Sequence, residues 1–261
     1  MARVVLSAAM RYLVLSDVHA NAFALEAVLA HAKRLEWDEV MFLGDAVGYY
    51  TRPQKTLDLL SELDPAVRIL GNHDALLLAM ADGESPSARE DSVVREVLTR
   101  HLEEISRDGL AFLRSLRARH ENEAWEAAHG ALRHQWEYLT SLQAAQANVE
   151  HMKARVCLVG HSHIPKVYAS VEAGGRELWR TVSFKQSRQT YRIPPKAKTF
   201  LNPGSVGQPR DGIPDAAYAL FDDEAMTFEV IRVGYEVARL QREVQEFGYP
   251  EALAVRLPPG R

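Results

Sequence analysis

The amino-acid sequence predicts an α/β fold, in which a parallel sheet carries helices and an antiparallel region follows. Two observations indicate this class. Short apolar runs alternate with helical patterns in the first third of the chain, which is typical of parallel strands joined by helices. From about residue 165, short runs separated by Gly and Pro turns take over, and these are typical of antiparallel strands.

Three buried strands are expected in the first region, at residues 12–16, 40–43 and 67–70. Helices are expected between them, at residues 21–35 and at residues 57–63, because apolar residues recur there at helical spacing. Asp, His or Asn residues follow each strand at its end. Since ligands bind beyond the carboxyl ends of strands in open α/β sheets, these residues are candidates for one site.

The remaining elements follow from the same patterns. Residues 82–120 are expected to form a helical insertion that opens with a loop over residues 82–90. Residues 165–233 are expected to form an antiparallel second sheet, and residues 234–248 a final helix that closes near Gly248. The whole chain, residues 1–261, is expected to be one domain, with a loose tail after the helix.

Composition excludes several classes of protein. Of the 261 residues, 47% are hydrophobic and 25% charged, as in ordinary globular proteins. A net charge of −4 gives no argument for a nucleic-acid partner, and no stretch approaches the roughly 20 apolar residues of a membrane helix. The single cysteine, Cys157, lies in an apolar run and is expected to be buried.

The first nine residues faintly resemble a secretion signal, but they run directly into the first strand. We therefore expect a cytoplasmic protein, with Met10 as a possible alternative start. The sequence leaves the oligomeric state open.

Five short clusters carry residues that bind metals. They are Asp17-Val18-His19, Gly44-Asp45, Gly71-Asn72-His73-Asp74, His129-Gly130 and Gly160-His161-Ser162-His163. Each cluster is unremarkable alone, because Asp-x-His and Gly-Asp are common in caps and turns. All five, however, follow apolar runs that a sheet would gather at one edge.

The spacing within two clusters strengthens this hypothesis. In an extended chain residues i and i+2 point the same way, so Asp17 with His19, and His161 with His163, can each aim two ligands at one centre. The other five histidines lie on expected helices or loops and are interpreted as solvated or structural. They are His31, His101, His120, His134 and His151.

The ligand types indicate which ions fit. Imidazole, carboxylate and amide oxygen without thiolate favour Mn²⁺, Fe²⁺ or Zn²⁺, with Ni²⁺ as a further alternative. Seven candidate ligands are too many for one tetrahedral zinc ion with an open position. They suit two ions that share a carboxylate and clamp a phosphoryl group.

In this order, the five clusters resemble those of the calcineurin-like metallophosphoesterases, over residues 10–235. The segment 202–210, Asn-Pro-Gly-Ser-Val-Gly-Gln-Pro-Arg, is similar to that of the small bacterial, phosphodiesterase-like branch. The resemblance implies two packed mixed sheets flanked by helices, an αββα sandwich with a helical insertion.

The resemblance also implies roles for the site residues. One metal, with Mn²⁺ expected first, would be held by Asp17, His19, Asp45 and His163. The other would be held by Asp45, Asn72, His129 and His161, so that Asp45 bridges the pair. His129 follows a variable insertion, and His134 is its alternative.

For catalysis, the resemblance implies that His73 protonates the leaving oxygen and that Asp74 orients the His73 ring. The segment after Asp45, Ala46-Val47-Gly48-Tyr49-Tyr50, lacks the acidic or Asn-rich loop of many family members, which leaves the substrate pocket open. Candidate anion contacts are Arg52, Arg133 and Arg210, of which Arg210 follows the Gly-Ser-Val-Gly loop.

The resulting hypothesis is a metal-dependent phosphoric ester hydrolase acting on a small phosphodiester or phosphomonoester, with nucleotides among the candidates, by attack of metal-activated water on phosphorus. A protein phosphatase or a dinucleoside-polyphosphate hydrolase is the alternative on the same site. A nuclease ranks below both, because no basic groove is apparent. A protein-binding scaffold of the same fold is the alternative of another class, but a scaffold has no chemical reason to keep all seven ligands.

Overall fold

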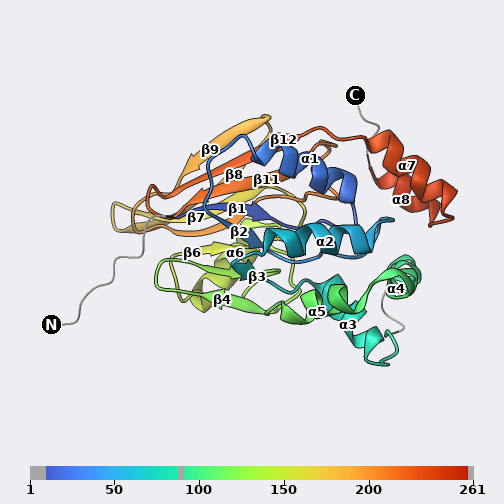
Figure 1. Ribbon diagram of the computed structural model, residues 1–261. Coiled ribbons are helices and arrows are strands. Elements are labelled where there is room, and N and C mark those ends of the chain that lie inside the picture. The colour runs from blue at the N-terminus through green and yellow to red at the C-terminus, as the bar shows by residue number, and fades with distance from the viewer. Residues whose placement is uncertain (1–9, 88–90, 258–261) are drawn as a thin grey trace.

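Two six-stranded mixed sheets pack face to face and carry helices on their outer faces (Figure 1). The computed structural model describes residues 10–87 and 91–257. The expectations for residues 1–9, for the end of the loop before residue 91 and for the last four residues lie outside these ranges. Within them, no helix is long and apolar enough to span a bilayer.

The first sheet has the strand order β3-β2-β1-β11-β12-β9, and the second has the order β4-β5-β6-β10-β7-β8. The strands of the first sheet are β1 (Arg11–Leu15), β2 (Glu39–Phe42), β3 (Val67–Arg68), β9 (Arg188–Arg192), β11 (Ala216–Asp222) and β12 (Thr227–Val233). Those of the second are β4 (Arg119–Glu121), β5 (Glu126–Ala128), β6 (Val156–Leu158), β7 (Lys166–Ala173), β8 (Arg176–Ser183) and β10 (Lys198–Asn202).

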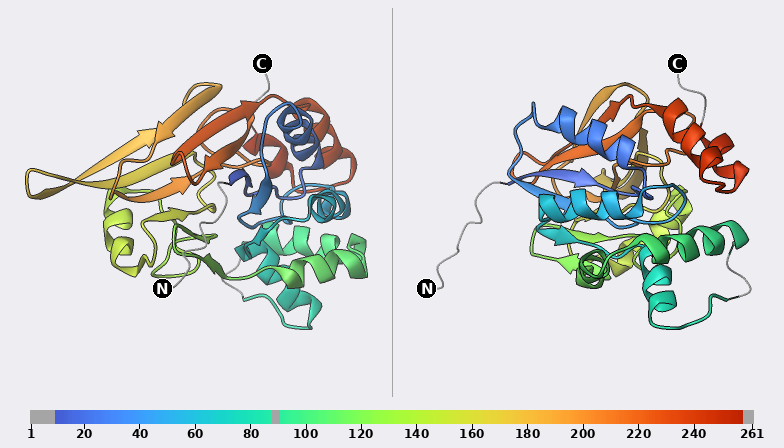
Figure 2. Two further views of the ribbon diagram at one scale, coloured as in Figure 1. Left: turned by 60° about the vertical axis from the view of Figure 1, so that its left-hand side comes forward. Right: turned by 45° about the vertical axis from the view of Figure 1, so that its right-hand side comes forward.

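The helices lie outside this double layer. They are α1 (Ala22–Ala32), α2 (Pro53–Leu63), α3 (Asn72–Ala81), α4 (Ser92–Glu104), α5 (Arg107–Ser115), α6 (Leu142–Asn148), α7 (Val237–Glu246) and α8 (Glu251–Arg256), with a short 3₁₀ turn, η1 (Val149–His151), after α6. The β7–β8 hairpin projects from the end of the molecule opposite α7 and α8 (Figure 2).

Strand β1 shows how the sequence builds the layers. Its alternate residues point to opposite faces of the sheet. Leu13 and Leu15 pack in the core beneath the helices, whereas Tyr12 and Val14 pack in the core between the two sheets. Since both faces are covered, the strand reads as a continuous apolar run, as expected for a buried strand. Cys157 is fully buried on the outer face of the second sheet, as predicted.

The expectation that residues 165–233 form a sheet of their own was wrong. Strands β7, β8 and β10 join the second sheet, whereas β9, β11 and β12 join the first. Strand β11 pairs antiparallel with β1, and β10 pairs parallel with β6. These pairings cover what would otherwise be the open edges of β1 and β6. Both sheets are mixed, because the antiparallel pairs β1–β11 and β10–β7 adjoin parallel ones.

Three helices, α3, α6 and α8, were not expected. Helix α3 begins within the Gly71-Asn72-His73-Asp74 cluster, and its continuous apolar run at residues 75–80 has no amphipathic period that would reveal it. Helix α8 follows the final helix, and its buried Leu253 and Ala254 pack in the same core as α7. The insertion at 82–120 contains the predicted helices but ends in strand β4.

Candidate metal centre

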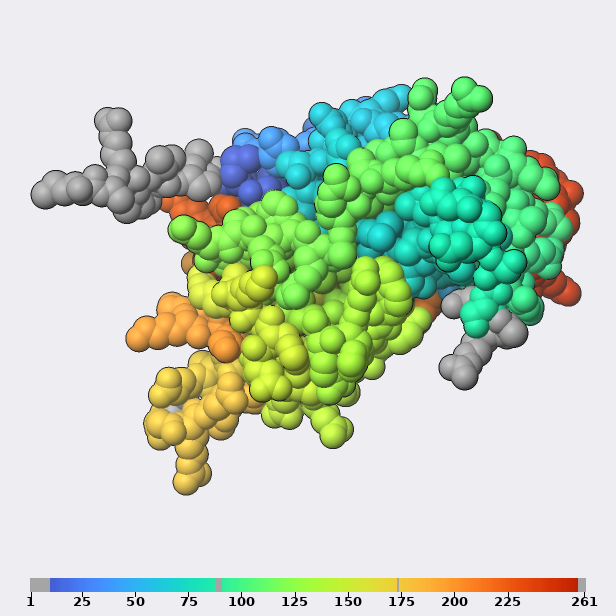
Figure 3. Space-filling model, turned by 90° about the horizontal axis from the view of Figure 1, so that it is seen from below, coloured from blue at the N-terminus to red at the C-terminus, as the bar shows by residue number. Residues whose placement is uncertain are grey.

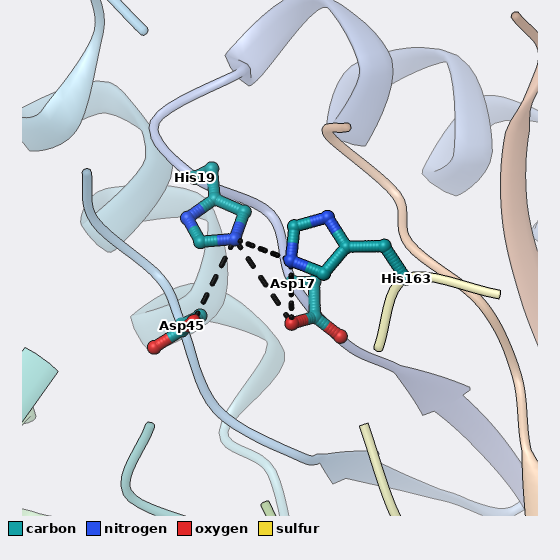
Figure 4. Close-up of side chains that lie close together, drawn as sticks. All are labelled: Asp17, His19, Asp45 and His163. Carbon is teal, nitrogen blue, oxygen red and sulfur yellow. Dashed lines mark hydrogen bonds and ion pairs between the residues drawn. The ribbon is translucent and has the colours of Figure 1, made fainter. Parts of the chain in front are cut away.

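The loops that follow four strands deliver six of the seven candidate ligands to one buried place, and the seventh, Asn72, begins α3. Asp17 and His19 follow β1, Asp45 follows β2, His129 follows β5, and the His161–His163 segment follows β6. The ligand atoms form two groups, and within each group all of them lie within 4.8 Å of one another. The first group is Asp17, His19, Asp45 and His163 (Figure 4), and the second is Asp45, His129 and His161.

The backbone at these ligands is unusual. Five of them have a positive φ, which residues other than glycine rarely adopt and which costs about 1–3 kcal/mol each. They are Asp17 (54°), His19 (53°), Asp45 (60°), His161 (63°) and His163 (59°). The expectation of an extended chain at these clusters was therefore wrong, although the division of His161 and His163 between two groups is the one that the resemblance implies. His161 and His163 belong to different groups, whereas Asp17 and His19, which have the same left-handed backbone, share one group.

Three of the histidines are anchored in the same way. In each, ring nitrogen Nδ1 lies within hydrogen-bond distance of a backbone carbonyl, which can only accept, so Nδ1 donates and Nε2 is left to face the centre. The pairs are His19 with Val47 (3.0 Å), His129 with Leu43 (2.7 Å) and His163 with Gln208 (2.7 Å).

The carboxylate oxygens and ring nitrogens that face the centre are suited to binding a cation. Nε2 of His129 lies 3.2 Å from Oδ2 of Asp45, and Nε2 of His163 lies 3.2 Å from Oδ1 of Asp17. Three of the inward atoms are buried without a hydrogen-bond partner among the described residues, namely Oδ1 of Asp17, Oδ2 of Asp45 and Nε2 of His129. Oδ1 of Asn72, at the start of α3, is likewise buried without a partner in the described part of the chain. Buried polar atoms of this kind are costly unless an ion satisfies them, so the residues present fit divalent metals.

The ionisation of the site follows from the same crowding. Burial alone lowers the pKa of His129, but the carboxylates of Asp45 and Asp17 outweigh burial and raise the pKa to about 9. Burial would raise the pKa of Asp45, yet His129 and His73 hold it well below its usual value. The metal-free centre therefore keeps its carboxylates charged and draws a positive charge to His129.

Asp74 does not orient His73, so that expectation was wrong. Its carboxylate accepts hydrogen bonds from the backbone N–H groups of Asp45 (2.8 Å), Ala46 (2.9 Å) and Gly71 (3.1 Å). Burial and the neighbouring Asp45 charge raise the pKa of Asp74 to about 7, although these amide bonds favour the charged form. Asp74 thus holds the Asp45 loop against the start of α3.

His73 lies beside the centre without an acidic partner. Its Nδ1 is buried and has no hydrogen-bond partner in the described residues. Gly48 (φ 89°) lies against the ring, and a Cβ atom on Gly48 would stand 2.5 Å from this Nδ1. The backbone N–H of His73 donates to Oδ1 of Asp45 (2.9 Å), so only Oδ2 of that carboxylate is free to face the centre.

This arrangement can be compared with known proteins. The family model described as the calcineurin-like phosphoesterase superfamily domain matches residues 10–226. The chain belongs to this superfamily. It is therefore a phosphoric ester hydrolase, and its two sheets flanked by helices are the αββα sandwich that the resemblance implies.

Relatives share almost the full length of this phosphoesterase. An uncharacterized protein of Methanocaldococcus jannaschii is 31% identical over 254 residues, which cover 95% of this chain and 97% of that protein. The crystal structure of a metallophosphoesterase from Sphaerobacter thermophilus is 33% identical, with a TM-score of 0.80 and coverage of 95% of this chain and 98% of that one. A hypothetical protein from Pyrococcus horikoshii OT3 shares the fold, at 18% identity and a TM-score of 0.74, over 95% of this chain and 97% of that one.

Aromatic side chains of the phosphoesterase surround the mouth of the centre. A cavity of about 490 Å³ opens there, and Asn72, His73 and His161 line it together with Tyr49 and Tyr138. The ring of Tyr138 stacks on that of His161, with centroids 3.9 Å apart. Figure 3 shows the surface of the segment between β5 and α6, in yellow-green, beside that of α3, in teal.

Of the three predicted arginines, one reaches this mouth. Arg210 donates from Nη2 to the hydroxyl of Tyr49 (3.3 Å). Arg52 forms an ion pair with Glu243, and Arg133 forms an exposed ion pair with Glu137. The alternative ligand His134 is exposed, on the segment between β5 and α6.

Sequence reasoning gave no role at the site to two residues that shape it. Tyr49, with a φ of 66°, lies within 4.7 Å of the His73 ring, centroid to centroid. The departure of the segment after Asp45 from the family pattern is the signal that could have found it. His101, interpreted as solvated or structural, is fully buried, and its Nε2 lies 2.7 Å from the Tyr50 carbonyl while the Gly48 N–H donates to its Nδ1 (3.3 Å).

Proposed function

We propose that this chain is a dinuclear metal-dependent phosphoesterase that hydrolyses a small phosphodiester or phosphomonoester by attack of metal-activated water on phosphorus. One observation carries the proposal. Two groups of ligand atoms adjoin each other and share Asp45, whose free Oδ2 lies 3.2 Å from Nε2 of His129 and 3.6 Å from Nε2 of His19. A single oxygen placed between two histidines of different groups suits a bridging ligand.

The residues of each proposed metal site follow from these groups. Asp17, His19, Asp45 and His163 would hold one ion, and Asp45, His129, His161 and Asn72 the other. Two divalent ions, when bound, would lower the pKa of a coordinated water and stabilise negative charge on the phosphate oxygens. Mn²⁺ is the ion that we propose first, because the ligand set combines imidazole with carboxylate and amide oxygen.

The chain's own residues would orient the metal ligands and supply a proton. Nδ1–H bonds to backbone carbonyls hold three ligand imidazoles in one orientation, and Asp74 fixes the loop that carries Asp45. His73 lines the mouth cavity beside Asn72, so it can meet the leaving oxygen of an ester bound there. We propose that His73 donates a proton to this oxygen.

The test is hydrolysis by purified protein loaded with Mn²⁺, assayed against phosphomonoesters, cyclic nucleotides, phosphodiesters, a phosphopeptide and a dinucleoside polyphosphate. We expect turnover of at least one small ester, and loss of that turnover in His129→Ala. His134→Ala is the matched control, because His134 is an exposed histidine on the neighbouring segment. No hydrolysis of any ester by metal-loaded protein would favour the scaffold, and turnover of the phosphopeptide alone would favour a protein phosphatase.

A further inference from the structure

Two arginines from distant parts of the chain meet on the outer side of Tyr49. The guanidinium carbon of Arg210 lies 5.8 Å from the centroid of the Tyr49 ring, and that of Arg256 lies 5.3 Å from it. Arg256 belongs to α8, which lies beyond the matched family domain. Helix α8 therefore contributes a positive charge to the surroundings of the centre.

These guanidinium groups line a second cavity, of about 470 Å³. Its walls are Tyr49, Gln208, Pro209, Arg210 and Arg256, with no acidic side chain among the described residues that line it. In the described part of the chain Arg210 donates to neutral oxygens, those of Gln208 (2.9 Å), Tyr49 (3.3 Å) and Tyr138. Two cations thus face one cavity without a carboxylate inside it.

Arg256 is only loosely paired. Its Nη2 lies 4.0 Å from Oδ2 of Asp91, the limit of an ion pair, and 39% of its side chain is exposed. A pair of this kind contributes little to stability and leaves most of the guanidinium donors free. The pairing therefore does not explain why the side chain lies over Tyr49.

Tyr49 connects this second cavity to the metal centre. Its ring lines both cavities and approaches the rings of His19 (4.6 Å) and His73 (4.7 Å) on its inner side. Its backbone is held at a φ of 66°, a costly conformation for an aromatic residue. The strained Tyr49 therefore separates two adjacent places for anions, one at the metals and one at the arginines.

We propose that the substrate is a phosphate ester that carries a second phosphate group, which Arg210 and Arg256 bind while the scissile phosphate lies at the metal centre. This inference rests on the proposed function, because the scissile group must occupy the metal site. The N–H donors that these two guanidinium groups leave free suit a dianionic phosphate better than a singly charged carboxylate. Arg256 is then a specificity-determining residue.

The experiment compares α,ω-alkanediol bisphosphates of three to six carbons with the corresponding monophosphates, using Mn²⁺-loaded protein. We expect kcat/KM to be about 10-fold to 100-fold higher for the best bisphosphate than for its monophosphate. In Arg256→Gln this ratio should fall about tenfold, chiefly through KM, and Arg256→Lys should retain part of it. Arg242→Gln, an exposed arginine on α7, is the matched control and should keep the ratio.

Equilibrium binding provides a second readout. Propane-1,3-bisphosphonate has no ester bond and is not hydrolysed, so calorimetry measures its affinity directly. Weaker binding in Arg256→Gln, with unchanged binding in Arg242→Gln, would support the inference even if no ester were turned over, in which case only the proposed function would fail. Two outcomes would overturn the inference. One is turnover of monophosphates with no preference for bisphosphates. The other is an equal loss of activity on both substrates in Arg256→Gln together with a lower Tm, because Arg256 would then be merely structural.

Discussion

Nε2 of His19 and Nε2 of His163 lie 3.1 Å apart in a buried site, although both rings are anchored through Nδ1 to backbone carbonyls. Both facing nitrogens are therefore lone-pair atoms in the neutral rings, and they repel unless a cation lies between or beside them. Burial lowers the pKa of His19 well below its usual value, so protonation of its ring does not relieve this repulsion at neutral pH.

This geometry predicts metal content. Protein purified without chelator and loaded with Mn²⁺ should approach two transition-metal ions per chain by elemental analysis. Chelation should lower the Tm, because an ion at a hundredfold excess over its Kd contributes about 2.7 kcal/mol per site. A content that stays at or below one ion per chain would contradict the dinuclear centre.

Asp45 should matter to both ions. In Asp45→Ala the shared oxygen is lost, so the occupancy of both sites should fall, whereas loss of a ligand to one ion should lower one occupancy. Asp58→Ala on α2, where Asp58 is exposed, is the control and should keep both ions. Metal titration followed by calorimetry would distinguish the cases, and retention of one tight site would show that Asp45 is not a bridge.

Asp74 should act through metal affinity rather than through proton transfer. Asp74→Asn replaces one acceptor oxygen by an N–H donor that faces backbone N–H groups, so the Asp45 loop should loosen. Substitution of groups that orient ligands typically costs 10-fold to 100-fold in metal affinity, and we expect a loss of this order. The relative rates on good and poor leaving groups should stay as in the wild type. A selective loss of rate on esters with poor leaving groups would instead indicate that Asp74 takes part in proton transfer.

His73 should act through proton transfer rather than through metal affinity. His73→Ala should keep both metals but lose roughly 10²-fold to 10⁴-fold in rate on alkyl phosphate esters, the span of general acid catalysis. The loss on nitrophenyl esters should be clearly smaller, because nitrophenolate leaves without a proton. Loss of metal would identify His73 as a ligand, and equal losses on both esters would indicate charge stabilisation.

The buried His101 predicts a pH dependence of stability. Burial lowers the pKa of His101 to about 4, although the Tyr50 carbonyl favours the proton, so the unfolded chain binds more protons between pH 4 and about 6.5. The free energy of unfolding should therefore fall as the pH falls through this range.

Denaturant titrations of the metal-free protein would measure this slope. His101→Gln keeps a donor for the Tyr50 carbonyl but does not titrate, so its slope should be smaller, by up to about 3 kcal/mol between pH 6.5 and 4. His134→Gln is the exposed control and should leave the slope unchanged. Identical slopes in His101→Gln and the wild type would contradict the prediction.

The order of elements could be predicted well, because local patterns carry that information. The apolar runs before Asp17 and Asp45 identified β1 and β2, which are buried on both faces. Helix α3 was not predicted, because its apolar residues are consecutive. Strand β11 was not assigned to the first sheet, because its pairing with β1 joins residues more than 200 positions apart.

By itself, the sequence determined which chemical groups this protein can bring to a site. The five clusters and their order carry the resemblance to the phosphoesterases, and their lack of thiolate specifies oxygen and imidazole ligands, since ligand type follows from residue type. Only the tertiary structure decided which atoms meet. His161 and His163 contribute to different ligand groups, backbone amides bind the carboxylate of Asp74, and the packing of α8 carries Arg256 to Tyr49. Such contacts depend on burial and chain direction across long separations, which no local pattern encodes.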